Sequence, residues 1–194
     1  MKPLSSSRIL FFRAGLTACL LALVFLSYPT PRVSAGKQRI SPVTVNSVRL
    51  LLDDAYFAAL VPALRQARQR IDIAMFLFKV NNEYPDNRPA MIVRELADAV
   101  KRGVKVQMVL ERSKKDLKLN ATHERVAELL QQSGVTVRFD SPRTTSHGKL
   151  VVIDRRLVFL GSHNFTHSAL SRNHEISVLL EDSRLAQQLL QSVF

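Results

Sequence analysis

The segment His147-Gly-Lys-Leu-Val-Val-Ile-Asp154 places a short apolar run between charged and titratable side chains. This run and the later Leu157-Val-Phe-Leu160 flank the polar turn 154–156, a pattern that is typical of a β-hairpin. Because side chains alternate along a strand, His147 and Lys149 project to the same face. We therefore predict a hairpin that presents an imidazole and an ammonium group together.

An imidazole beside a fixed ammonium group suits phosphate chemistry. The imidazole of His147 can attack phosphorus while the ammonium group of Lys149 holds the charge on the non-bridging oxygens. Downstream, Gly161-Ser-His-Asn-Phe-Thr166 places the Ser162 hydroxyl and the Asn164 amide on a tight turn. Both groups can donate hydrogen bonds to the same oxygens, so this span predicts a phosphate-binding site.

A carboxylate follows this turn in Asn173-His-Glu175. Glu175 could orient the imidazole of His147 and hold one of its tautomers. The histidines at 163, 167 and 174 lie in the same span, but without cysteines beside them we do not expect a zinc site. The sequence thus predicts a site that uses no metal and no other cofactor.

Strands and helices alternate on both sides of the hairpin. Short apolar or alternating segments predict strands at 43–52, 71–78, 104–110, 135–139 and 176–180, in addition to the hairpin strands 150–153 and 157–160. Periodic segments predict helices at 53–70, 89–102, 122–132 and 183–193, with a kink or division of the first at Pro62. This order predicts an α/β sandwich with a mixed, mostly parallel sheet flanked by helices.

The charge of the chain favours a polyanionic partner. Its 194 residues carry a formal net charge of +12, and residues 36–194 hold 24 basic against 16 acidic groups. A basic folded body attracts nucleic acids or acidic lipid surfaces. Cys19 is the single cysteine, which excludes an intramolecular disulfide.

The N-terminus has the order of a secretory signal. Basic residues precede the apolar run Leu16–Leu26, and helix-breaking prolines and the small-residue sequence Val33-Ser-Ala-Gly36 follow it. The run is much shorter than the roughly 20 residues that span a bilayer. We expect a signal peptide at 1–35 that is cleaved near Ala35, a linker at 36–42 and one domain at 43–194, in an exported protein. An uncleaved membrane anchor is the alternative.

The spans His147–Asp154, Gly161–Thr166 and Asn173–Glu175 together resemble the phospholipase D superfamily. The resemblance is closest to its small single-motif members, which are bacterial secreted endonucleases and the mitochondrial cardiolipin hydrolase branch. It extends from about Val43 to the C-terminus. Gly148 departs from the family pattern, in which a larger residue is common at this position.

The resemblance implies a role for each site residue. His147 would be the nucleophile and would form a phosphohistidine that water then hydrolyses, without a metal. Lys149, Ser162 and Asn164 would bind the phosphate oxygens, and Glu175 would hydrogen-bond to His147. Asp154 is the third named residue of the motif, and in the family it supports structure beside the site.

Two-step phosphodiester chemistry needs a second imidazole, which acts as acid for the leaving oxygen and as base for water. Longer relatives in the family carry two copies of the motif, whereas this chain has no second H-x-K pattern. We therefore expect a homodimer in which each protomer contributes His147 to a site on the two-fold axis.

The sequence leaves the substrate open. An endonuclease that cleaves DNA or RNA is the first hypothesis, and the lysines in 113–118 together with Arg143 could contact its backbone. A hydrolase of phospholipid headgroups at a membrane and an inactive nucleic-acid-binding module are the alternatives. We expect His123 to be solvated, and Phe76, Phe78 and Phe139 to lie in the core.

Overall fold

The computed structural model of the chain describes residues 47–81 and 87–194. The expected signal peptide or anchor at 1–35 and the linker at 36–42 lie outside the described residues, so both stay predictions. Within the described ranges, no helix has the length and hydrophobicity to cross a bilayer.

Strands and helices alternate along the described chain. In order they are β1 (Val48–Leu52), α1 (Ala55–Gln66), β2 (Arg70–Met75), α2 (Arg88–Lys101), β3 (Lys105–Leu110), α3 (Leu117–Gln132), β4 (Thr136–Phe139), β5 (Lys149–Ile153), β6 (Leu157–Gly161), α4 (His167–Ser171), β7 (Ile176–Glu181) and α5 (Ser183–Val193). All were predicted except α4, a short helix whose N-terminus is capped by the Thr166 hydroxyl. Pro62 lies inside α1 without dividing it.

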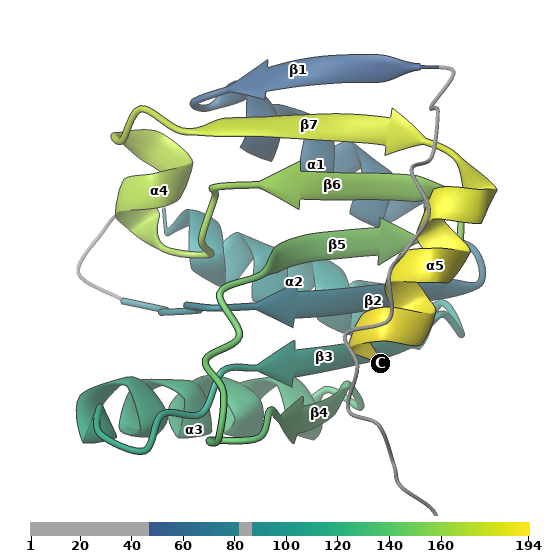
Figure 1. Ribbon diagram of the computed structural model, residues 1–194. Helices are drawn as coiled ribbons and strands as arrows, with labels where there is room; N and C mark the ends of the chain where they lie inside the picture. The colour runs from purple at the N-terminus through teal and green to yellow at the C-terminus, as the bar shows by residue number, and fades with distance from the viewer. Residues whose placement is uncertain (1–46, 82–86) are drawn as a thin grey trace, which may run out of the picture. The chain divides into compact units, whose positions relative to one another are not determined.

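The strands form one sheet in the order β1-β7-β6-β5-β2-β3-β4 (Figure 1). The pairings of β2 with β3 and of β3 with β4 are parallel, because α2 and α3 carry the chain back between these strands. The other four pairings are antiparallel. The predicted mixed sheet flanked by helices is therefore confirmed, but the prediction that it is mostly parallel is wrong. Beyond β4 the chain reverses direction from strand to strand without a helical crossover.

Helices cover the two faces of the sheet unequally (Figure 1). On one face, α1, α2 and α3 enclose the larger core, whose biggest buried side chains include Tyr56, Phe78 and Phe159. On the other face, α5 packs through Ala186 and its partly buried leucines on a smaller apolar cluster. The large core fixes the sheet, and the edge at which β2 and β3 end carries the candidate site.

Two buried histidines are built into this framework as neutral groups. The Nε2 atom of His123 accepts a hydrogen bond from the Phe78 N–H (3.2 Å), so its Nδ1–H donates to the Glu111 carbonyl (2.8 Å). His163 stacks on Tyr56 with ring centroids 4.3 Å apart and contacts Ser177 Oγ through Nδ1. Burial lowers the pKa of both histidines, with hydrogen-bonded neighbours acting in the opposite direction.

These histidines predict that the fold loses stability in mild acid. The folded state binds their protons less readily than the unfolded chain, whose histidines titrate near 6.5. Their contribution is complete above that pH and is lost as pH falls below it. We expect a lower Tm at about pH 5.5 than at about pH 7.5. The difference should shrink in His163→Gln, and an equal difference in parent and variant would contradict this prediction.

A close approach of β6 and β7 requires glycine at position 161. Gly161 pairs with Ser177, and a Cβ atom at position 161 would lie 2.5 Å from the Ile176 carbonyl oxygen and even closer to Ser177. We expect Gly161→Ala to lower the free energy of unfolding by about 1–3 kcal/mol in urea denaturation. Gly148→Ala is the control, because no atom lies within 4 Å of a Cβ placed there. Similar losses in both variants would argue against the steric cause.

Candidate active site

The centre of the site is a buried ammonium group beneath an exposed imidazole. Lys149, the first residue of β5, is only 6% exposed, whereas His147 lies open to solvent. The Lys149 Nζ atom lies 3.0 Å from Nδ1 of His147 and donates to the His147 carbonyl oxygen at 2.8 Å. Since an ammonium group only donates, a hydrogen bond between the two groups requires Nδ1 to be the acceptor. The predicted neighbouring imidazole and ammonium group are therefore present.

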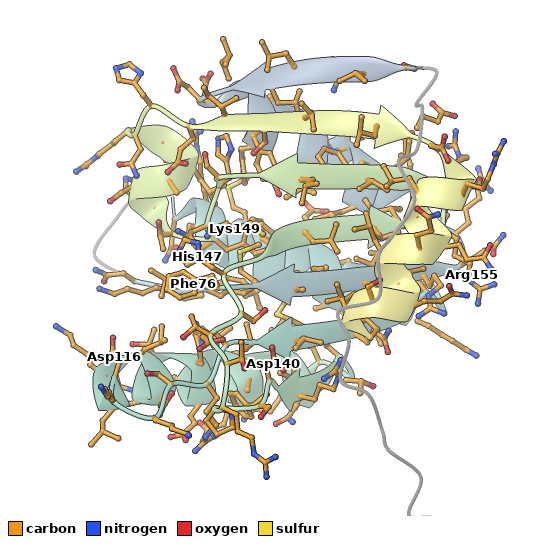
Figure 2. The ribbon with its side chains drawn as sticks, in the orientation of Figure 1. Phe76, Asp116, Asp140, His147, Lys149 and Arg155 are labelled. Carbon is orange, nitrogen blue, oxygen red and sulfur yellow. The ribbon has the colours of Figure 1, made fainter. Side chains whose placement is uncertain are left out.

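Phe76 holds this pair from the side. It follows β2, and its ring centroid lies 4.1 Å from that of His147, while Lys149 Nζ lies 4.8 Å from the same ring (Figure 2). Phe76 is half-buried, so the prediction that it belongs to the core is wrong; Phe78, two residues on, is the fully buried one. Burial lowers the pKa of Lys149, and the charge of Glu175 acts in the opposite direction.

A buried carboxylate fixes the approach to His147. Glu111 is 2% exposed and accepts a hydrogen bond from the Ser146 N–H at 2.7 Å. The Glu111 carbonyl is in turn held by His123, which also receives the Phe78 N–H. His123 is therefore buried, and the prediction that it is solvated is wrong. Its spacing from the apolar residues of α3 at positions 126, 127 and 130 could have revealed this, because all of them share one helix face.

Ser162 and Glu175 contact each other at the same edge of the sheet. The Ser162 hydroxyl donates to the Glu175 carboxylate, which also accepts from the Asn173 side chain at 3.0 Å. Asp53, at a positive φ of 48°, accepts the Glu175 N–H at 2.9 Å. Among the described residues these groups, and not His147, are the hydrogen-bond partners of Glu175. Its expected bond to the imidazole stays a prediction.

Asn164 lies in a turn that is fastened to the end of β2. The next residue, Phe165, forms an isolated bridge with Phe78, and its carbonyl accepts the Lys79 N–H at 2.9 Å. The Asn164 Oδ1 atom is buried and has no hydrogen-bond partner among the described residues. The turn therefore brings the Asn164 side-chain oxygen, without a hydrogen-bond partner among the described residues, to the edge of the sheet that carries His147.

Asp154 lies at the opposite end of β5 from the imidazole. Its carboxylate accepts the backbone N–H groups of Arg68, Gln69 and Arg70 at 2.9, 2.7 and 3.0 Å. The structure thus brings His147 and Lys149 together and places Ser162 and Glu175 with each other, while Asp154 ties the hairpin turn to β2. Within 47–81 and 87–194, no group of three or more His, Cys, Asp or Glu residues could hold a metal ion.

Comparisons with known proteins cover the domain that carries the site. The family model described as "Cardiolipin synthase, PLD-like domain" matches residues 60–193. A phospholipase D of Rickettsia prowazekii is 39% identical over 105 residues, which are 54% of this chain and 49% of that protein. The virion nicking-joining enzyme of vaccinia virus is 29% identical over 66% of this chain and 30% of its own length.

A solved structure extends the agreement to the fold. The phospholipase D family member Nuc of Salmonella typhimurium superposes with a TM-score of 0.61 at 26% identity, over 75% of this chain and 90% of that one. The matched part is about half of the length of the Rickettsia relative and 30% of the length of the viral one. The comparison therefore covers only the domain that these proteins share. On its sequence, its fold and its paired histidine and lysine, this chain belongs to the phospholipase D superfamily.

Proposed function

We propose that the protein is a metal-independent endonuclease that cleaves DNA or RNA through a phosphohistidine intermediate, in a site shared by two protomers. The observation that carries this proposal is the exposed imidazole of His147, which lies 3.0 Å from the buried ammonium group of Lys149. A nucleophile that faces solvent can reach a phosphodiester within a long polymer. A desolvated ammonium group beside it stabilises negative charge more strongly than one in water.

In the first step a ring nitrogen of His147 attacks phosphorus. A phosphate oxygen that enters the site draws the Lys149 hydrogen bond away from the imidazole and frees its lone pair. The nitrogen–phosphorus bond forms as the bond from phosphorus to the leaving oxygen breaks, and that oxygen takes a proton. In this proposal the Ser162 hydroxyl and the Asn164 side-chain N–H donate to the non-bridging oxygens.

In the second step water attacks the phosphohistidine. The phosphorus–nitrogen bond breaks, and the products are a phosphate monoester and an alcohol. A base must remove the proton of water, and an acid must have supplied the proton of the first leaving group. The His147 imidazole of the second protomer can perform both tasks in turn, which is why we propose a homodimer.

An exposed apolar surface next to the site supports this dimer. We name it the apolar face, and it consists of Val48, Leu50, Leu52, Leu160 and Ile176. Strand pairing places Leu52 opposite Ile176 and gives Leu50 and Leu160 a common neighbour in β7. Ile176 is 63% exposed, and it directly follows Glu175. A contiguous apolar patch beside an open site is typical of a surface that another protein covers.

Charge supports a nucleic acid as the substrate. The body carries 24 basic and 16 acidic groups from residue 36 onward, and the viral relative is named a nicking-joining enzyme. The phospholipase D name of the Rickettsia relatives keeps phospholipid headgroups as the second candidate. Export after cleavage near Ala35 fits an extracellular or periplasmic nuclease, whereas an anchored N-terminus would favour a lipid substrate.

The first test is degradation of plasmid DNA by the purified protein in excess EDTA, with His147→Ala in parallel. We expect the parent to cut DNA without metal and the variant to lose at least about 10³-fold in rate, because it lacks the nucleophile. RNA and anionic phospholipid are assayed beside DNA. Hydrolysis of lipid alone would overturn the nuclease assignment, and DNA binding without cleavage of any substrate would favour the inactive binding module.

A mixing experiment tests the shared site. When parent and His147→Ala are unfolded together in equal amounts and refolded, random pairing leaves roughly a quarter of the dimers with two imidazoles. We expect nuclease activity of roughly a quarter of that of the same total amount of parent, whereas independent sites would retain roughly half. Sedimentation of the mixture verifies that dimers have formed.

A further inference from the structure

A set of exposed basic side chains lies at the edge of the sheet that carries the active site, and the proposed reaction does not use them. Lys114, Lys115, Lys118 and Arg143 are all exposed, and we name this set the basic rim. No ion pair involves any of the four within the part of the chain that the structure describes. These side chains are available for a ligand.

The basic rim is attached to the segment that carries His147. The lysines follow the end of β3, where the Glu111 side chain accepts the Ser146 N–H at 2.7 Å. Arg143 lies in the connection from β4 to β5, which begins where the Asp140 N–H donates to the Leu110 carbonyl at 2.8 Å. Figure 2 shows Asp116 and His147 toward one end of the sheet and Arg155 at the opposite end.

Lys114 and Lys115 project from an ordered turn, and Lys118 lies in the first turn of α3. The Ser113 hydroxyl accepts the N–H groups of Lys115 and Asp116, and the Asn120 side chain both donates to and accepts from the Ser113 backbone. The acidic groups nearby have partners of their own: Asp116 accepts the Leu119 N–H, and Glu124 pairs with Arg112. A polyanion that binds here therefore meets positive charges whose backbone is already in place, so little ordering entropy is lost.

We propose that the basic rim binds phosphates of a nucleic acid strand on one side of the scissile phosphate, so that the substrate is a polynucleotide and not a short diester. This inference rests on the nuclease function proposed above and deepens it. Each lysine that neutralises a phosphate releases counterions, which makes binding dependent on strand length and salt.

Leu117 lies among these lysines and is 74% exposed. An exposed leucine between lysines makes a lipid surface the competing ligand. Burying one leucine yields only about 1.5–3 kcal/mol, and even a whole myristoyl chain binds a membrane only marginally. One leucine is therefore a poor anchor, whereas three lysines and an arginine match a chain of phosphates.

The test compares two triple variants of the full protein that remove the same charge. In the rim variant Lys114, Lys115 and Lys118 are changed to Gln; in the control variant Arg68→Gln, Lys105→Gln and Arg155→Gln remove three exposed charges at the far end of the sheet. We expect the rim variant to raise KM for a duplex of about 30 base pairs about tenfold or more, and to lower the slope of log KM against log salt by about 3. The control variant should show neither change.

Hydrolysis of bis(4-nitrophenyl) phosphate distinguishes a wrong assignment of the basic rim from a wrong assignment of the nuclease function. This small diester cannot reach the rim, so a rim variant that still hydrolyses it is folded and has an intact centre. DNA cleavage by the rim variant that equals that of the parent overturns the basic rim alone. A parent that hydrolyses the small diester and leaves DNA intact overturns the nuclease function together with the rim.

Vesicles of phosphatidylglycerol and phosphatidylcholine distinguish the lipid alternative. We expect Leu117→Asn to cleave DNA like the parent. If vesicle binding by the parent is strong and is lost in both Leu117→Asn and the rim variant, while DNA cleavage is unaffected in both, the surface binds membranes and the proposal is wrong.

Discussion

The antiparallel pairing of β2 with β5 is the contact on which both the fold and the site depend. It joins the parallel strands to the antiparallel ones, and it is held at both ends. At one end the Asp154 carboxylate accepts the N–H groups of residues 68–70; although its burial opposes ionisation, these bonds hold the pKa of Asp154 below its usual range. At the other end the Phe76 N–H donates to the Gly148 carbonyl at 2.9 Å. With both ends held, the His147 imidazole lies against the Phe76 ring.

The reactive group of the site differs in solvent exposure from the groups that hold it in place. The nucleophilic imidazole is exposed, whereas the groups that define its place are buried: Lys149 beneath it, and Glu111 and His123 behind the preceding backbone. A buried ammonium group costs desolvation free energy, which is offset where a phosphate supplies opposite charge. His123 stays neutral, because its Nε2 atom accepts the Phe78 N–H and therefore cannot also carry a proton. Binding of an anionic substrate and stability of the empty site are thus linked through Lys149.

Most of the fold could be predicted from sequence periodicity, since the strands and helices found in the structure follow apolar patterns of the expected period. The errors have a common origin. The direction of β5 relative to β2 is decided by how the chain returns after β4, which no local pattern records. Likewise, Phe76 and Phe78 look alike in an apolar run, but both lie beyond the end of β2 at Met75, and only Phe78 is bridged to Phe165 and fully buried. His123 became buried because α3 turns its apolar face toward the sheet.

By itself the sequence determined the family, the identity of the paired imidazole and ammonium group, and the basic charge of the body, because these follow from residue types at fixed spacing. Only the tertiary structure decided which other groups surround that pair. The Phe76 ring, the Glu111 carboxylate and the Ser162–Glu175 contact come from segments far apart in the chain. They meet because β2, β3, β6 and β7 all reach the same edge of one sheet, and that meeting is a property of strand order and not of any single segment.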